Sequence, residues 1–193
     1  MAQQQNRDRE EAATNQNRDR EGAANDRPAT TYLITWVCYG AWLPGQNGIV
    51  DGTHNRFGAR FPEPNAAQEL QSRNCMAQEP YLLDLARRQI VLKSLEEVCS
   101  HRRWALLAAH VRTNHVHVVT AANCRPEQVM STMKAYSSRA LNAYALDIPD
   151  RLRWPRPGST RYLWTGDSVR AAIQYVVREQ GELMAALETP SPR

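Results

Sequence analysis

No run of apolar residues in the sequence approaches the length of about 18 that a helix needs to cross a membrane. The N-terminal region also lacks the apolar core of a signal peptide, so we expect a cytoplasmic protein with no membrane partner. No CxxC pair is present, which argues against a zinc knuckle and against a disulfide scaffold. We expect reduced, mostly buried thiols at the four cysteines, Cys38, Cys75, Cys99 and Cys124.

The charge of the chain is unevenly distributed. The net charge is +4 and the sequence pI is about 9.0. Residues 1–27 carry five arginines and six carboxylates, which leaves 19 basic and 14 acidic residues in the rest of the chain. A basic body favours a polyanionic partner such as nucleic acid, although many basic proteins bind none.

The N-terminal region contains a near-perfect tandem repeat, residues 5–15 and then 16–26, with alternating charge and almost no core-forming residue. This composition predicts disorder or a loose helix, and two repeats are too few for a solenoid. We therefore expect a disordered extension over residues 1–28, one folded domain over 29–188 and a flexible C-terminus over 189–193.

Hydrophobic periodicity and turn residues predict strands and helices in the rest of the chain. Their order, strand, helix, strand, strand, helix, strand, helix, is typical of a ferredoxin-like α+β sandwich with an added C-terminal helix. Residues 43–79 show no sustained period and are long for a loop, so they are either functional or packed on their own. The expected strands cover residues 31–42, 104–111, 115–121 and 161–164, and the expected helices cover 80–101, 126–144 and a last segment that Asp167 or Ser168 caps and Gly181 interrupts or ends.

Two histidines, His115 and His117, lie two residues apart in a predicted strand. Strand side chains alternate between faces, so both imidazoles project from one face and form half of a site for a divalent metal. A third ligand has to come from elsewhere. The alternative is a pair of half-exposed strand histidines without a metal. His110, on the preceding strand, is better explained as a satisfied core or edge histidine than as a ligand.

The last predicted helix places Tyr175 away from its apolar stripe, which Ala172 and Val176 help to form. Glu179 follows four residues later and shares the face of Tyr175. The helix therefore presents a phenol and a carboxylate on one surface, as a nucleophile near a metal would require. The alternative is an ordinary amphipathic helix whose tyrosine packs at the edge.

These features resemble the HUH single-tyrosine transposases of bacterial insertion sequences and their REP-associated relatives, over about residues 31–187. His115-Val116-His117 corresponds to the HUH motif of that family. The other similar segments are Thr35–Gly45, Met133–Arg139, Arg161–Trp164 and Ile173–Gln180.

The resemblance implies a ferredoxin-like transposase that cleaves and rejoins single-stranded DNA near hairpin ends with Mg²⁺ or Mn²⁺, through a 5′-phosphotyrosine at Tyr175. It also implies a bacterial cytoplasmic protein that is nucleoid-associated when bound to DNA. A polar residue one helical turn after the tyrosine completes the metal site in this family. We prefer Glu179 on that spacing, with Gln180 as the alternative, because Gln180 would point about 100° further round a helix. Family members act either as homodimers that exchange the tyrosine helix or as monomers.

Several basic and aromatic residues are candidates for contacts with DNA. Tyr136 competes with Tyr175 for the role of nucleophile, but its position in the family pattern favours a DNA contact or packing. We expect Trp154 and Tyr162 to offer stacking platforms and Trp36 and Trp164 to lie in the core. The residues expected to contact DNA are Lys134, Tyr136, Arg139, Arg151, Arg153, Arg156 and Arg161.

Two other functions remain open from the sequence. One is a domesticated protein that binds single-stranded nucleic acid without catalysis. The other is a small metallohydrolase that uses His115, His117 and Glu179, with Tyr175 incidental. Single-stranded hairpin oligonucleotides with Mn²⁺ separate the three, because a transposase forms a covalent adduct, a hydrolase releases free ends and a binding protein only shifts the DNA.

Overall fold

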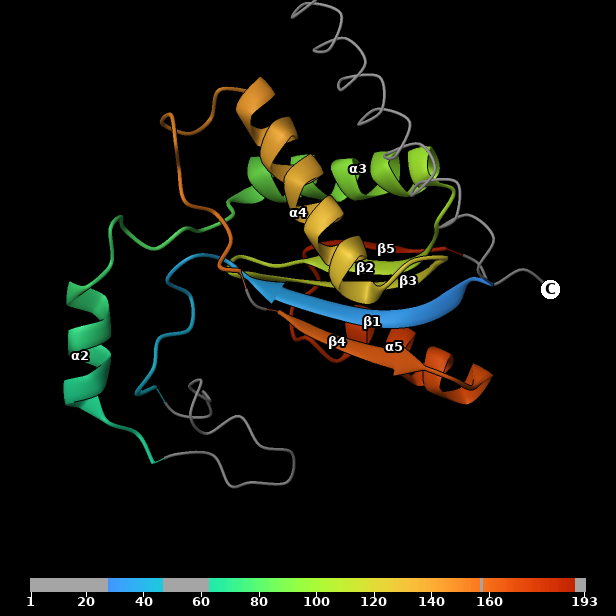
Figure 1. The fold of residues 1–193 in the computed structure, drawn as a ribbon, viewed down its shortest axis with the longest axis horizontal. Coiled ribbons are helices and arrows are strands. Elements are labelled where there is room, and N and C mark those ends of the chain that lie inside the picture. The colour runs from blue at the N-terminus through green and yellow to red at the C-terminus, as the bar shows by residue number, and fades with distance from the viewer. Residues whose placement is uncertain (1–27, 47–62, 157, 190–193) are drawn as a thin grey trace, which may run out of the picture.

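The computed structural model describes residues 28–46, 63–156 and 158–189, which form one antiparallel sheet with helices on both faces (Figure 1). The N-terminal repeat and most of the predicted flexible C-terminus lie outside the described residues. The elements are β1 (Thr30–Val37), α2 (Ala66–Asn74), α3 (Leu85–Arg102), β2 (Ala105–Val111), β3 (His115–Ala122), α4 (Pro126–Ala143), β4 (Ser159–Leu163), α5 (Gly166–Arg178) and β5 (Ala185–Glu188).

The five strands lie in the order β4-β1-β3-β2-β5, and every neighbouring pair is antiparallel. The first four strands, with α3 and α4 as their crossovers, have the ferredoxin-like order. The predicted α+β class is therefore confirmed. The short strand β5 was not predicted, and it extends the sheet at the edge of β2.

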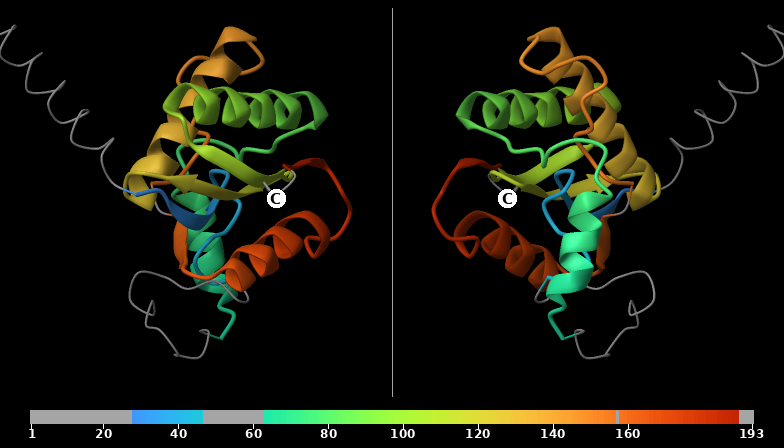
Figure 2. Two further views of the ribbon diagram at one scale, coloured as in Figure 1. Left: turned by 90° about the vertical axis from the view of Figure 1, so that its right-hand side faces the viewer. Right: turned by 90° about the vertical axis from the view of Figure 1, so that its left-hand side faces the viewer.

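The sheet separates two cores, because side chains alternate between its faces. Helices α3 and α4 cover one face and α5 covers the other (Figures 1 and 2). The larger core, under α3 and α4, includes Trp36 and Val118 at 1 % and 0 % exposure. The smaller core, under α5, includes Val119 and Val176. Helix α5 is thus held against the sheet by its apolar stripe, as the sequence predicted.

Several strand and helix limits differ from the prediction, and three of the differences have a clear physical reason. Strand β1 ends at Val37 rather than at residue 42. The Cys38 N–H still bonds to the Asn114 carbonyl in the register of β3, but the Tyr39 N–H turns to the Arg153 carbonyl and leaves the ladder. Helix α3 begins after Asp84, whose side chain accepts from the Arg87 N–H, and not at Pro80. Helix α5 is capped by Thr165 in a capping box with Ser168.

Helix α2 lies within the segment that was predicted to have no sustained period. It stands apart from the two layers (Figure 1), and none of its residues is buried. Asn65 caps α2. Gly45, which lies earlier in the chain but contacts Asn65, adopts φ +95°. A side chain at Gly45 would meet the Asn65 carbonyl oxygen at 2.5 Å, so this turn requires glycine.

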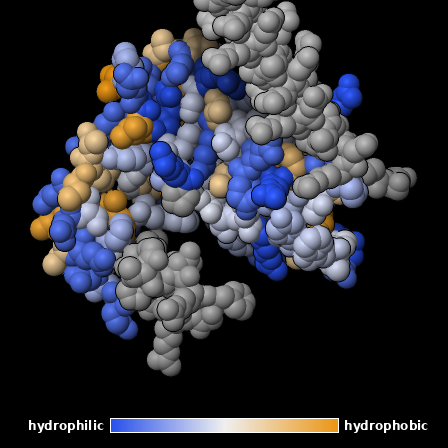
Figure 3. All heavy atoms as spheres, in the orientation of Figure 1, coloured by the Kyte–Doolittle hydropathy of each residue, from blue (hydrophilic) through white to orange (hydrophobic). Residues whose placement is uncertain are grey.

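The described surface is mostly hydrophilic on the face seen in Figure 3, where hydrophobic residues are scattered among polar ones. Apolar residues scattered singly over a protein surface are normal and need no special explanation. Within the described residues, none of the helices is both long and apolar enough to cross a membrane.

Candidate active site

The two histidines lie on β3, the central strand, and project toward α5. Their ring centroids are 4.8 Å apart. Val116 and Val118, which alternate with them, are buried in the larger core on the other face. The expected placement of both imidazoles on one face is therefore what the structure shows.

Each imidazole is held by a hydrogen bond at Nδ1. His115 Nδ1 lies 2.7 Å from Asn114 Oδ1, and His117 Nδ1 lies 2.7 Å from Thr35 Oγ1 on β1. An amide oxygen can only accept, so Nδ1 of His115 carries the proton and its Nε2 keeps the lone pair. The same tautomer of His117 is compatible with the Thr35 hydroxyl as acceptor. Nδ1 bonds of this kind orient histidines that bind metals.

Both histidines are neutral near pH 7. Burial lowers the pKa of His115 to about 4, helped by the positive charge of Arg112 and by His110. Burial also lowers the pKa of His117 to about 4, helped by His115, while a hydrogen bond with Gln180 opposes the shift at both rings. Neutral imidazoles keep the lone pairs that a metal or a proton would take.

Tyr175 lies on α5 directly over the second histidine. The ring centroids of Tyr175 and His117 are 5.6 Å apart, with the rings nearly perpendicular. Tyr175 is 41 % exposed, whereas Val176 beside it is 0 % exposed and packs on the sheet. The helix therefore holds the phenol at the site while keeping it open to solvent.

The residues after Tyr175 are arranged differently from a continued helix. Helix α5 ends at Arg178, and Glu179 leaves helical geometry with φ −106°. The Glu179 carboxylate accepts from Gln174 Nε2 at 2.9 Å. Gln180 Nε2 donates to the Tyr175 carbonyl at 3.3 Å, and the Gln180 side chain lies near enough to both imidazoles to raise their pKa values. The structure thus brings Gln180 to the histidines, where helical spacing favoured Glu179.

His117 and Tyr175 share a cavity of about 490 Å³ between the sheet and α5. Two residues that flank this cavity are suited to a nucleotide. Arg161 on β4 is exposed there, and its role as a phosphate contact stays a prediction. Trp42, whose ring centroid lies 5.9 Å from that of His115, was not predicted as a site residue. The other lining residues are Leu33, Thr35, Ser159, Ser168, Ala171 and Ala172.

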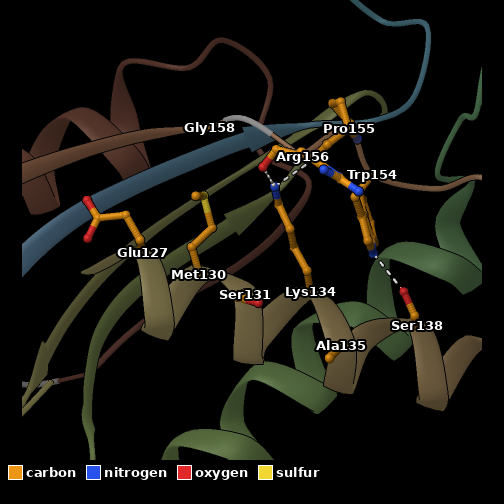
Figure 4. A pocket seen from close by; sticks show the side chains of 10 residues that line it. All are labelled: Glu127, Met130, Ser131, Lys134, Ala135, Ser138, Trp154, Pro155, Arg156 and Gly158. Atoms are coloured by element: carbon orange, nitrogen blue, oxygen red, sulfur yellow. Dashed lines mark hydrogen bonds between the residues drawn. The ribbon is translucent and has the colours of Figure 1, made fainter. Parts of the chain in front are cut away.

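Two of the expected DNA contacts have structural roles on the other face of the sheet. Lys134 donates from Nζ to the carbonyls of Pro155 and Arg156 at 2.9 and 3.2 Å (Figure 4), and burial lowers its pKa to about 8. Arg153 is 6 % exposed and forms an ion pair of 2.8 Å with Asp147. Both cations hold the connector, the segment between the end of α4 and the start of β4. This role differs from the phosphate contacts that were expected of Lys134 and Arg153.

The remaining basic candidates also lie away from the histidines. The Arg139 guanidinium lies 4.3 Å from the ring centroid of Tyr136, and both residues belong to α4. Arg156 is exposed and lines a second cavity, of about 580 Å³, between α4 and the connector (Figure 4). Arg151 donates to the carbonyl oxygens of Glu79 and Pro80. Tyr136 is therefore separated from the histidines by the sheet, whereas Tyr175 is beside them.

The aromatic candidates differ from expectation at one position. Trp36 is buried as predicted, but the prediction of a core position for Trp164 was wrong, because its side chain is 75 % exposed. Trp164 stacks on Tyr162 with ring centroids 4.9 Å apart and 12° between the planes. Trp154 is half-buried and packs edge-on against Trp36.

A metal bound by the two histidines would need an oxygen ligand from a residue other than Asp or Glu. In the described part of the chain, no three His, Cys, Asp or Glu side chains come close enough to hold a metal ion. His115 and His117 supply two nitrogen donors, and the Gln180 amide oxygen is the atom left for a third bond because Nε2 donates to Tyr175. Two neutral imidazoles and an amide oxygen are chemically suited to bind a divalent cation.

Comparisons with known proteins bear on this site. The model of the IS200-like transposase family matches residues 75–167, which include both histidines but not Tyr175. Among solved structures, a REP-associated tyrosine transposase bound to a REP hairpin is similar at 11 % sequence identity, with a TM-score of 0.44. That alignment covers 79 % of this chain and 67 % of the other chain. No curated protein matches the sequence.

Proposed function

Through residues 75–167 the chain belongs to the family of IS200-like transposases, and on that premise we propose that it cleaves and rejoins single-stranded DNA with Tyr175 as nucleophile. The observation that carries the proposal is the position of Tyr175 over His117, at 5.6 Å between ring centroids in one open cavity. The family match ends before Tyr175, so this geometry supports the nucleophile independently of the match.

The chemistry assigned to the chain is a reversible transfer of a phosphoryl group. The Tyr175 oxygen loses its proton to solvent and bonds to phosphorus, while the bond from phosphorus to the 3′ oxygen breaks and that oxygen takes a proton. The 5′ end stays on the tyrosine. A 3′-hydroxyl then loses its proton and attacks the same phosphorus, and Tyr175 leaves and regains a proton. This step rejoins the DNA without an external energy source.

The residues around Tyr175 bind and orient the phosphate. Arg161 faces the cavity and offers a bidentate cation for a phosphate oxygen. Trp42 offers an aromatic face on which a base of an unpaired strand can stack. A duplex keeps its bases stacked inside, so this arrangement favours a single strand.

His115, His117 and Gln180 would hold the divalent metal that this chemistry uses. A bound Mg²⁺ or Mn²⁺ ion supplies positive charge to the non-bridging oxygens of the phosphate. The Nδ1 bonds to Asn114 and Thr35 keep the Nε2 atoms of the two histidines available for that role.

The experiment that tests the proposal is covalent capture. Protein is incubated with end-labelled hairpin oligonucleotides that carry single-stranded flanks, in Mn²⁺, Mg²⁺ or EDTA, and adducts are resolved under denaturing conditions. We expect a labelled adduct with either metal, none in EDTA and none with Tyr175→Phe. The matched control, Tyr136→Phe, should form the adduct normally. Free cleaved ends without an adduct indicate a hydrolase, and a gel shift without cleavage indicates a binding protein.

A further inference from the structure

A third histidine, His110, lies in the same layer but takes no part in the proposed chemistry. It is 0 % exposed on β2 and pairs across the ladder with His117. Its side chain faces the end of α5 and the residues that follow that helix.

His110 uses both of its ring nitrogens. Nδ1 lies 2.9 Å from the Val176 carbonyl oxygen, and Nε2 lies 3.2 Å from the Met184 amide nitrogen. A carbonyl only accepts and an amide N–H only donates, so the Nδ1–H tautomer alone satisfies both partners. A buried histidine with two matched partners is a specific connection between the sheet and two separate backbone segments.

These bonds fall at the point where α5 ends. The last carbonyls of a helix have no donor from the helix itself, and His110 supplies one to Val176, the neighbour of Tyr175. The bond to Met184 fixes the chain where it returns to the sheet as β5. Between these two points lies Gln180, whose side chain reaches the two site histidines.

Another contact holds the same returning segment. Arg112, in the β2–β3 turn, donates from Nη1 to the Glu182 carbonyl at 3.0 Å. The segment from the end of α5 to β5 is thus attached to β2 and its turn rather than only to its own helix. The sheet that carries the histidines therefore also fixes the position of Tyr175 relative to them.

We propose that His110 is a positioning residue that caps the last turn of α5 and thereby fixes Tyr175 and Gln180 relative to His115 and His117. This inference rests on the proposed function for its effect on catalysis. Misplacing a reacting group by about 1 Å can slow a reaction roughly 10²-fold without a change in binding. The rate of adduct formation should therefore depend on the Nδ1 bond, whereas DNA affinity should not.

Two polar variants separate the two bonds of His110. Asn places an N–H donor near the position of Nδ1 and keeps the Val176 bond, whereas Gln places its polar group near Nε2 and loses it. We expect His110→Asn to form the tyrosine adduct within about threefold of the wild-type rate, and His110→Gln roughly 10²-fold more slowly. Both should bind fluorescent hairpin DNA with unchanged affinity. His101→Gln, at an exposed position near the end of α3, is the control and should match wild type.

Hydrogen exchange gives a readout that does not require catalysis. In His110→Gln, the amides at the end of α5 and just after it, residues 177–180, should exchange faster, because the cap on the last turn is gone. In His110→Asn, exchange should accelerate at Met184 while the last turn stays protected. These measurements decide the capping role even if wild type forms no adduct, a result that would reject the proposed function alone.

Three outcomes overturn the inference. Equal adduct rates in His110→Asn and His110→Gln mean that the Val176 bond does not position the tyrosine. Equal protection of residues 177–180 in the two variants means that His110 does not cap the turn. Failure of both variants to fold, or a loss of rate that only follows a loss of DNA affinity, means that His110 acts solely as a core residue.

Discussion

Removal of the Thr35 hydroxyl isolates the bond that orients His117. Thr35→Val keeps the size and the β-branched shape of the side chain on β1 but leaves His117 Nδ1, in a ring that is 5 % exposed, without its partner at 2.7 Å. An unsatisfied buried polar group costs about 1–3 kcal/mol, so the free energy of unfolding should fall by about that amount. Loss of a bond that orients a metal-binding histidine typically weakens metal affinity about 10- to 100-fold.

The assay titrates Mn²⁺ in adduct formation at saturating hairpin DNA. For Thr35→Val, we expect the Mn²⁺ concentration at half-maximal rate to rise about 10- to 100-fold, with DNA affinity unchanged. Thr31→Val is the matched control, because Thr31 lies on the same strand and the same face but pairs with Ala121, at the far end of the ladder from His117. An unchanged Mn²⁺ requirement in folded Thr35→Val would refute the assignment of His117 as an oriented ligand.

Three further predictions follow from the same structure. Burial lowers the pKa of His115 and His117 from 6.5 to about 4, so the unfolded chain binds protons before the folded protein does as pH falls. The free energy of unfolding, measured by urea denaturation, should therefore decline between about pH 6.5 and 4. The decline should be less steep in His117→Gln. Arg153→Met leaves buried Asp147 with one cation fewer and should lower the free energy of unfolding by about 3 kcal/mol while leaving DNA affinity of the folded protein unchanged; reduced affinity with full stability would contradict this. Arg161→Gln should do the reverse, weakening DNA binding and reducing its salt dependence by about one counterion in fluorescence anisotropy, with an unchanged melting temperature.

The parts of the fold that follow from local periodicity could be predicted from the sequence. Strand alternation placed His115 and His117 on one face, and the apolar stripe with Val176 placed Tyr175 off the core. Strand β5 could not be predicted, since Ala185–Glu188 has too little alternation and is defined by pairing with β2. Helix α2 was missed because no side chain in it is buried, so it carries no apolar period.

The finer parts of the site depend on contacts between distant segments. The preference for Glu179 assumed that α5 continues, but the helix stops at Arg178, where His110 from β2 bonds to Val176. Basic character likewise did not distinguish Arg153, which is paired with a buried carboxylate, from exposed Arg161. Charge and spacing are local properties, whereas the use of each side chain is set by tertiary packing.

The most direct test of the central claim is to identify the residue that carries DNA in the covalent adduct. Wild-type protein is trapped with hairpin DNA in Mn²⁺, digested with nuclease and protease, and mapped by tandem mass spectrometry. The account predicts a 5′-phosphonucleotide on Tyr175, in the peptide that ends at Arg178. A nucleotide on Tyr136, on the far side of the sheet from the histidines, would contradict it.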